Sequence, residues 1–178
     1  LINGIGVASQ MHGLVLVDEN QEVRRPPIIW CDSRAVPIGE QAFQEMGPDY
    51  CQEQLLNSPG NFTASRLKWV KDNEPEIYEK AAHLLLPGDY IAMRLTGEIR
   101  TTASGLSEGI LWDFQENTPA TLVMDYYGFD KSLLPELVAT FSLQGAVTTS
   151  AAKATGLTSG TPVNYRAGDQ PNNALSLN

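Results

Sequence analysis

The chain has 178 residues, of which 42% are hydrophobic and 19% are charged. This length suits one globular domain with a sizeable core, and the composition excludes a disordered protein. The net charge of −9 argues against binding to nucleic acid or to an anionic membrane surface, because there is no basic patch to displace counterions. The two cysteines form neither a metal-ligand pattern nor a disulfide framework, so we expect a cytoplasmic protein.

Three short strands are predicted near the start of the chain, over residues 2–8, 14–18 and 28–30. A polar stretch from Ser9 to Gly13 separates the first two strands, and Gly13 permits a positive φ or a close approach of backbone. Met11 and His12 therefore lie at a strand break, where side chains can point toward a ligand. A single histidine without a motif is more often structural, so both interpretations stay open at this point.

Helices are expected to fill most of the middle of the chain, because capping residues, prolines and glycines bound its apolar-periodic stretches. They are predicted over residues 33–46, 49–56, 63–73, 76–82, 87–95, 118–127 and 150–155. Residues 84–86 are short and apolar and predict a strand or a buried link. Residues 101–109 are rich in Thr, Ser and Gly and predict a loop.

The segment near the C-terminal end predicts a strand-to-helix junction. An apolar stretch leads to the small pair Ala167-Gly168 and then to Asp169, and Pro171 suits the first position of a helix over 172–177. Ligands of α/β sheets bind at the carboxyl ends of strands, so a general base is expected at Asp169. A second interpretation is that Asp169 only caps the helix that follows it.

Other residues have weaker claims to a functional role. Asp32 ends the third predicted strand, where it can reach the same cleft or form a cap or an ion pair with Arg34. Asn61 and Phe62 precede a helix whose start borders the expected cleft. Glu108 is a second carboxylate, but the sequence does not fix its distance from the expected base.

Structural roles are expected for most of the remaining aromatic and basic residues. The tryptophans are expected in the core rather than as platforms for a sugar ring: Trp30, Trp69 and Trp112. Three basic residues are expected on a solvated helix face: Arg66, Lys68 and Lys71. His83 precedes an apolar run without any motif around it and is interpreted as structural.

Five sequence elements occur in a fixed order along the chain. They are Ser9-Gln-Met-His-Gly-Leu-Val15, Trp30-Cys-Asp-Ser-Arg34, Gly60-Asn-Phe-Thr-Ala-Ser-Arg-Leu-Lys-Trp69, Leu86-Pro-Gly-Asp-Tyr90 with Leu95-Thr-Gly97, and Ala167-Gly-Asp-Gln170. Together they resemble the first domain of the FGGY carbohydrate kinases, and within that family the xylulokinases most closely. The Met-His-Gly element is the most sugar-specific of the five, whereas Gly-Asp-Gln is shared more widely.

The resemblance implies both a fold and a reaction. The fold is an α/β domain of the ribonuclease H-like (actin-like ATPase) type, with a mixed sheet flanked by helices. The reaction is ATP-dependent phosphorylation of a ketopentose, with D-xylulose converted to D-xylulose 5-phosphate as the leading hypothesis. Asp169 matches the family's catalytic base, which accepts the proton of the attacking hydroxyl. Four residues match its sugar contacts: Met11, His12, Asp169 and Gln170.

Two alternatives to this reaction remain. One is an FGGY kinase for another sugar or polyol, such as ribulose, fuculose, rhamnulose, gluconate or glycerol. The other is a regulator that binds sugar and has lost catalysis. Two departures from the xylulokinase pattern weaken the substrate assignment more than the reaction: Cys31 and Gln170 stand where many xylulokinases have Asn. Gln keeps the amide donor and acceptor on a longer arm.

The resemblance also places residues 1–178 within a longer protein. They correspond to the sugar-binding N-terminal domain without its opening phosphate-loop strands, and a C-terminal nucleotide-binding domain is expected beyond them. ATP and Mg²⁺ would bind largely outside this segment, so no metal ligand or nucleotide contact is assigned within it. The chain by itself is expected to have no kinase activity. The expected partners are a sugar and MgATP, and a homodimer stays open.

Overall fold

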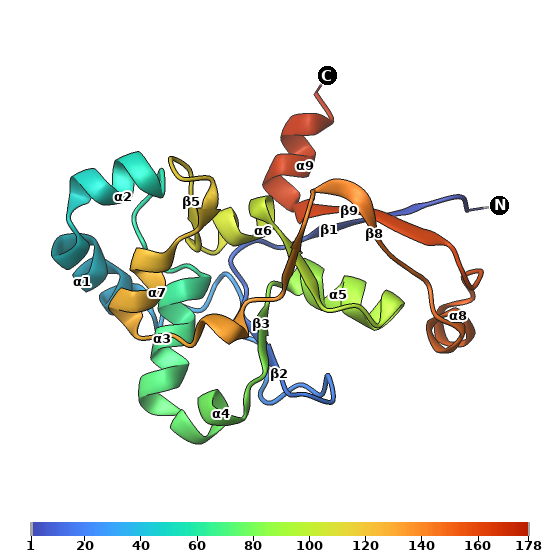
Figure 1. Cartoon of the computed structure of the whole chain (residues 1–178), viewed down its shortest axis with the longest axis horizontal. Coiled ribbons are helices and arrows are strands. Elements are labelled where there is room, and N and C mark those ends of the chain that lie inside the picture. Colours follow the sequence, from blue (N-terminus) through green and yellow to red (C-terminus); the bar gives the residue numbers. More distant parts are fainter. Residues whose placement is uncertain (1, 178) are drawn as a thin grey trace.

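A three-stranded sheet and a cluster of helices lie at opposite ends of the molecule (Figure 1). The computed structural model describes residues 2–177 of the chain. The sheet contains β1 (Ile5–Ser9), β9 (Pro162–Gly168) and β8 (Phe141–Ala146), in the order β1-β9-β8. Strand β9 runs parallel to β1 and antiparallel to β8, so the sheet is mixed, as expected.

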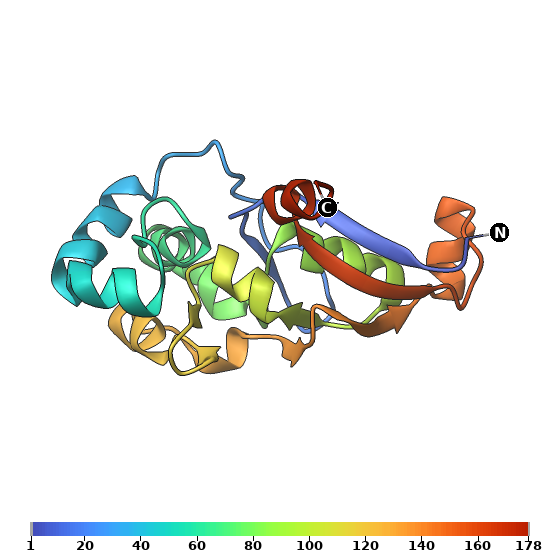
Figure 2. The ribbon, with the colours of Figure 1, turned by 90° about the horizontal axis from the view of Figure 1, so that it is seen from above.

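Helix α5 (Pro87–Thr96) packs along this sheet and contacts all three of its strands. Figure 2 shows β1 and β9 running side by side over the helix. The apolar core between helix and sheet is small and contains Val7, Ala92 and Val163. Gly97 ends α5 with a φ of 77°, which a residue without a Cβ adopts at little cost. The helix therefore supports β1 and β9 along their length.

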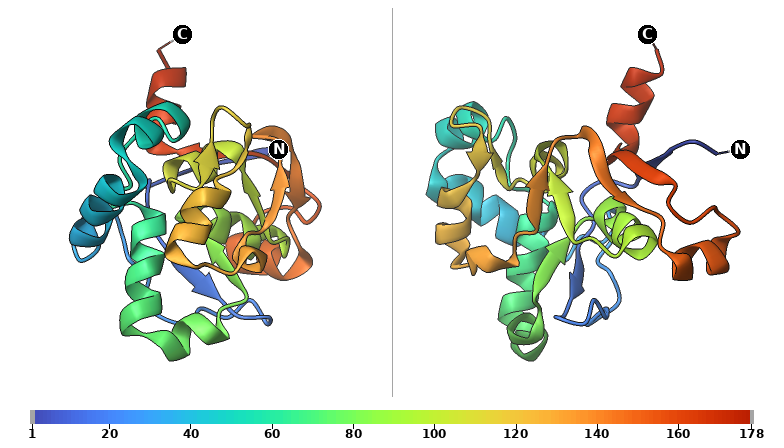
Figure 3. Two further views of the ribbon diagram at one scale, coloured as in Figure 1. Left: turned by 60° about the vertical axis from the view of Figure 1, so that its left-hand side comes forward. Right: turned by 45° about the vertical axis from the view of Figure 1, so that its right-hand side comes forward.

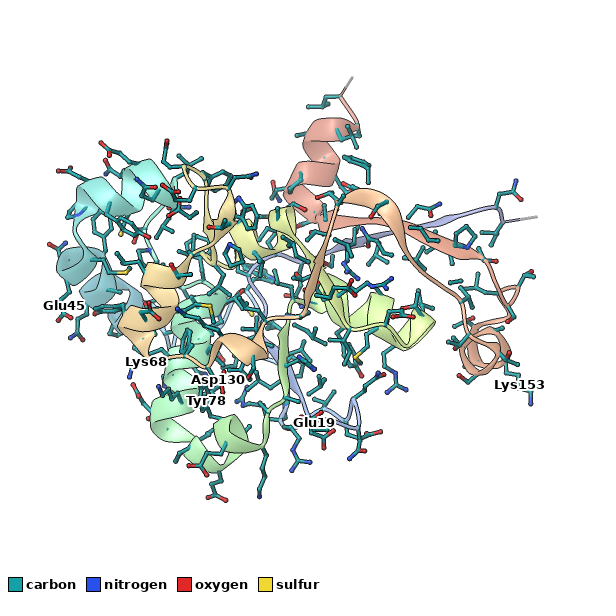
Figure 4. The ribbon with its side chains drawn as sticks, viewed as in Figure 1. Glu19, Glu45, Lys68, Tyr78, Asp130 and Lys153 are labelled. Carbon is teal, nitrogen blue, oxygen red and sulfur yellow. The ribbon has the colours of Figure 1, made fainter. Side chains whose placement is uncertain are left out.

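The other end of the molecule is mostly helical. Its helices are α1 (Val36–Met46), α2 (Pro48–Gln54), α3 (Thr63–Asn73), α4 (Pro75–Lys80) and α7 (Thr121–Tyr127). Their apolar faces surround the largest buried core, in which Leu67, Val70 and Met124 have almost no exposed surface. Burial of such side chains, rather than helix propensity, stabilises helices this short. Charged side chains such as Glu45 and Lys68 lie on the outside of the cluster (Figure 4).

Short strand pairs lie outside the three-stranded sheet. They are β2 (Val15–Val17) with β3 (His83–Leu85), β4 (Arg100–Thr102) with β7 (Glu136–Val138), and β5 (Trp112–Asp113) with β6 (Thr118–Pro119). The β4-β7 pair is parallel, and the other two are antiparallel. The remaining helices are α6 (Ala103–Glu108), a 3₁₀ turn at Lys131–Leu133, and α8 (Thr149–Thr155).

Helix α9 (Asp169–Leu175) follows β9 directly and projects away from the rest of the molecule in both views of Figure 3. None of its side chains is buried. Among residues 2–177, no helix is both long enough and apolar enough to cross a membrane.

Two of the predicted elements are wrong. Residues 28–30 do not form a strand: only Ile28 pairs, in a single bridge with Leu14. The chain turns directly after Ile28, because the Asp32 N–H donates to the Ile29 peptide oxygen at 3.0 Å, and the pairing therefore cannot continue to Trp30. Residues 101–109 are not a loop but the end of β4 followed by α6, because the Thr102 side chain accepts the Gly105 N–H and caps the helix.

Several predicted helices exist but begin elsewhere. Helix α1 begins at Val36 rather than Ser33, with Pro37 in its first turn. Helix α7 begins at Thr121, because Thr118 and Pro119 pair as a strand. Helix α9 begins at Asp169, so Pro171 is its third residue rather than its first. The other predicted helices and the strand near residues 84–86 are confirmed within a few residues.

Candidate functional site

The ends of two adjacent parallel strands meet at one place in the fold. Ser9, the last residue of β1, pairs with Gly168, the last residue of β9. The polar segment after Ser9 and the Asp169-Gln170 pair after Gly168 therefore leave the same edge of the sheet. The carboxyl ends of neighbouring parallel strands are where α/β proteins bind ligands.

A cleft of about 240 Å³ opens at this edge. Its lining residues come from segments that are distant in the sequence: Gln10, Met11, His12, Trp30, Asp169 and Gln170. All four residues that the sequence motifs single out are thus brought together. Gln10 and Trp30 are additional. Trp30 is 62% exposed, so the expectation that it belongs to the core is wrong.

A buried guanidinium holds the backbone on one side of the cleft. Arg66 is fully buried and donates hydrogen bonds to the peptide oxygens of His12 and Trp30, the latter at 3.0 Å. The expectation that Arg66 lies on a solvated helix face is therefore wrong. Lys68 lies at the surface as expected, where it forms an ion pair with Asp72. His12 has a φ of 64°, which is uncommon for a residue with a side chain, and Arg66 offsets the cost of that conformation.

Gly13 is required next to this turn. A Cβ added to Gly13 would lie 2.4 Å from Cγ of the Pro87 ring, so no larger residue fits. The Thr63 hydroxyl donates to the Gly13 peptide oxygen at 3.2 Å, and Thr63 is the first residue of α3 rather than its side-chain cap. Of the two roles that the sequence left open for Gly13, close packing against its backbone is confirmed, and Gly13 does not have a positive φ.

The His12 imidazole is held in one orientation. Its Nδ1–H donates to the Glu108 peptide oxygen, with the two atoms 2.8 Å apart, and its ring meets the Phe62 ring edge-on at 4.4 Å between centroids. Burial lowers the pKa of His12, and the nearby charge of Arg66 lowers it further, so the ring is neutral at neutral pH. With Nδ1 protonated, Nε2 is a hydrogen-bond acceptor. A neutral imidazole of this kind suits a sugar hydroxyl.

Asp169 enters the cleft from the end of the other strand, β9, as the first residue of α9. Gly168 is the N-cap of that helix, and no side chain caps it, so Asp169 does not have the capping role that was left open. The junction is tightly packed: a Cβ on Gly168 would lie 2.3 Å from Cγ of Met11. The Asn172 amide donates to the peptide oxygens of Ala167 and Gly168, at 3.2 and 2.8 Å.

Glu108 contacts both strand ends that form the cleft, through hydrogen bonds to His12 and Gly168. Its carboxylate accepts the Gly168 N–H, with Oε1 2.7 Å from the nitrogen. Burial raises the pKa of Glu108 to about 7, and the negative charges of Asp89 and Asp169 raise it as well, whereas the Gly168 hydrogen bond lowers it. The sequence left the place of this carboxylate undetermined. The pairing of β1 with β9 and the packing of α6 against β4 and β9 bring it here.

The weaker candidates take structural positions. Asp32 forms a bidentate ion pair with Arg34, in which Nε donates to Oδ1 and Nη2 donates to Oδ2, and these bonds lower the pKa of Asp32. Asp32 does not line the cleft. Asn61 donates to the Asp32 peptide oxygen, so the two segments support each other. Within residues 2–177, no three His, Cys, Asp or Glu side chains lie close enough together to hold a metal ion. Of the other two tryptophans, Trp112 is buried as expected and Trp69 is partly buried.

Comparison with known proteins decides the family. The model of the FGGY family of carbohydrate kinases, N-terminal domain, matches residues 1–176. The chain belongs to this family. It is 33% identical over 165 residues to the xylulose kinase of Bacillus subtilis (strain 168), which covers 91% of the chain and 32% of that protein. This chain of the FGGY family thus spans about a third of the length of that relative.

Solved structures agree on the fold of this FGGY domain. The xylulose kinase from Rhodospirillum rubrum superposes with a TM-score of 0.89 and 29% identity, over 98% of this chain and 36% of that one. The Plasmodium falciparum glycerol kinase with ADP gives a TM-score of 0.85 at 20% identity, over 96% of this chain and 35% of that one, which shows the fold alone. The expected ribonuclease H-like, actin-like class is confirmed. Because a xylulose kinase and a glycerol kinase share this fold, the fold does not select the substrate.

Proposed function

We propose that this chain forms the sugar site of an ATP-dependent kinase that converts D-xylulose to D-xylulose 5-phosphate. The observation that carries the proposal is the single cleft lined by Met11, His12, Asp169 and Gln170 at adjacent strand ends. It combines an apolar wall, a neutral imidazole, an amide and a carboxylate. Such a set matches a polyhydroxylated substrate, because each hydroxyl needs a donor or an acceptor in a walled pocket.

Asp169 is proposed as the general base. Its carboxylate takes the proton of the C5 hydroxyl while that oxygen forms a bond to the γ-phosphorus of ATP. The bond from this phosphorus to the bridging oxygen breaks, and ADP leaves. Mg²⁺ neutralises charge on the phosphate oxygens when MgATP is bound. The described residues supply the sugar side of the reaction: Met11 as an apolar wall, and His12 and Gln170 as hydrogen-bonding partners of the sugar.

The similarity to xylulose kinases favours xylulose over other sugars. The B. subtilis and R. rubrum proteins carry that name. The Met11-His12-Gly13 turn also resembles the xylulokinase pattern at its most sugar-specific element. Cytoplasmic location is part of the proposal, because Cys31 and Cys51 are both free thiols, which suits a reducing compartment.

Replacement of the base tests the reaction. In the full-length protein, Asp169→Asn should lower turnover by about 10²- to 10⁴-fold, the usual contribution of a general base, while D-xylulose binding measured by calorimetry persists. Asp32→Asn is the matched control, because Asp32 is a carboxylate near the same edge that pairs with Arg34 instead of lining the cleft. Turnover by Asp169→Asn equal to that of the control would reject Asp169 as the base.

A substrate panel tests the specificity. The full-length protein is assayed with D-xylulose, ribulose, fuculose, rhamnulose, gluconate and glycerol, and kcat/KM should be highest for D-xylulose. A higher kcat/KM for another sugar would support the proposed kinase reaction but reject D-xylulose as its substrate. Binding without turnover on any of them would favour a sugar-binding regulator.

A further inference from the structure

Glu108 is the one carboxylate that contacts both walls of the cleft within the described part of the chain. Its peptide oxygen accepts from Nδ1 of His12, and its side chain accepts from the Gly168 N–H. One residue of α6 thus fixes the imidazole on one side and the residue before Asp169 on the other.

The surroundings of Glu108 make its ionised state energetically unfavourable. The residue is 7% exposed and lies between two hollows. One hollow adjoins Met11 and His12, and the other is a narrow space that Asp89 and Arg166 also line. The titratable or charged groups that face it are Asp89 from α5, Asp169 from α9, His12 from the turn after β1, and Arg166 from β9.

A carboxylate is nevertheless the stronger partner for the Gly168 N–H. Hydrogen bonds to an ionised acceptor are shorter and about twice as strong as bonds between neutral groups. The N···O distance of 2.7 Å lies at the short end of the range for such bonds. A group that costs stability when ionised, yet makes this bond at the entrance to a catalytic helix, fits a functional role better than a structural one.

We propose that Glu108 is a positioning residue whose ionised carboxylate fixes the Gly168-Asp169 junction, while its peptide oxygen fixes the His12 ring. The inference rests on the proposed function, because it assumes that Asp169 is the base. Glu108 would act by holding Asp169 in place, because a base displaced by a fraction of an ångström loses alignment with the attacking hydroxyl. Protonation of Glu108 weakens the bond to Gly168, so kcat should fall as the pH drops through about 7.

Two substitutions in the full-length protein test this role. Glu108→Gln keeps the shape and an acceptor oxygen but removes the charge. It should lower kcat at pH 8 about tenfold, change the sugar KM less than about threefold, and abolish the decline of kcat near pH 7. Glu108→Ala removes the acceptor and should lower kcat about 100-fold. If the Glu108→Ala protein does not fold, the kcat and pH profile of the Glu108→Gln protein alone test the positioning role.

The outcomes separate this inference from the proposed function. A Glu108→Gln protein with the wild-type kcat and pH profile would overturn the positioning role. So would a variant whose loss of activity follows loss of folding or of sugar binding, because that indicates a structural role. Asp169→Asn is assayed in parallel. If it retains wild-type turnover, the proposed base and this inference both fail. If it is inactive while Glu108→Gln is normal, only the inference fails.

Discussion

The two walls of the cleft are built in different ways. The His12 wall is fixed by buried contacts, since Arg66 and Thr63 bond to its backbone and the Pro87 ring packs against Gly13. The Asp169 wall is the start of a short helix that buries none of its side chains. The difference indicates that the turn proposed to bind the sugar is set in place when the chain folds. The position of Asp169, the proposed base, depends in contrast on a few hydrogen bonds around Gly168.

The largest effect is expected when the buried guanidinium is removed from the His12 wall. Arg66→Met keeps much of the apolar volume but leaves the peptide oxygens of His12 and Trp30 without their donor. Each buried acceptor without a partner costs roughly 1–3 kcal/mol, so we expect a loss of about 4 kcal/mol in the free energy of unfolding, measured by urea denaturation. Sugar affinity should fall with it, because the His12 turn loses its support.

Lys68→Met is the matched control for this substitution. Lys68 lies on the same helix but on the outside of the helical cluster (Figure 4), where it forms an exposed pair with Asp72. Its loss should cost no more than about 0.5 kcal/mol. Equal destabilisation by the two substitutions would refute the difference drawn between the buried and the solvated face of α3.

An intermediate effect is expected from the titration of Glu108, which bonds to the residue before Asp169 and makes the stability of the folded protein depend on pH. Burial raises the pKa of Glu108 to about 7 in the folded protein, so the folded state holds this proton more tightly than the unfolded chain. The contribution to stability is present at low pH and is lost as the pH rises from about 4.5 through about 7. Relative to wild type, Glu108→Gln should therefore gain stability between pH 5 and pH 8, by on the order of 3 kcal/mol. Thermal unfolding at the two pH values measures the change, and a pH-independent difference would contradict it.

A smaller effect is expected from the anchor of α9. Asn172→Ala removes the amide that bonds to the peptide oxygens of Ala167 and Gly168, and should cost about 1 kcal/mol of stability. Because this bond helps to orient the start of α9, kcat should fall more than the sugar KM rises. Asn173→Ala is the control on the same exposed helix, and it should leave both constants unchanged. A similar drop in kcat for both variants would indicate a general effect on the helix.

The sequence predicted that the Ser9–Gly13 and Ala167–Asp169 motifs lie at one site, but it did not predict the residues that hold them there. The strand break at Ser9–Gly13 and the small pair before Asp169 are local signals, and parallel pairing of β1 with β9 brings them together. Arg66 was misplaced because helical periodicity identifies a face but not the segment that packs on it. The proline-rich approach to Trp30 looked apolar enough for a strand, yet Trp30 lies in the open cleft.

Contacts between distant segments also explain why the sequence did not predict α6 or the place of Glu108. Strand β4 pairs with β7, which lies more than 30 residues later, so a Thr-rich segment that looks like a loop becomes a buried strand end. The place of Glu108 follows from that change, because α6 starts directly after β4. Short-range patterns contain no information about such a pairing.

The most direct test of the account is a crystal structure of the full-length protein with D-xylulose. We expect the sugar in the cleft between the two walls, with one hydroxyl within hydrogen-bond distance of Nε2 of His12 and the C5 hydroxyl within hydrogen-bond distance of the Asp169 carboxylate. A sugar bound elsewhere, or one in this cleft with its C5 hydroxyl turned away from Asp169, would contradict the account.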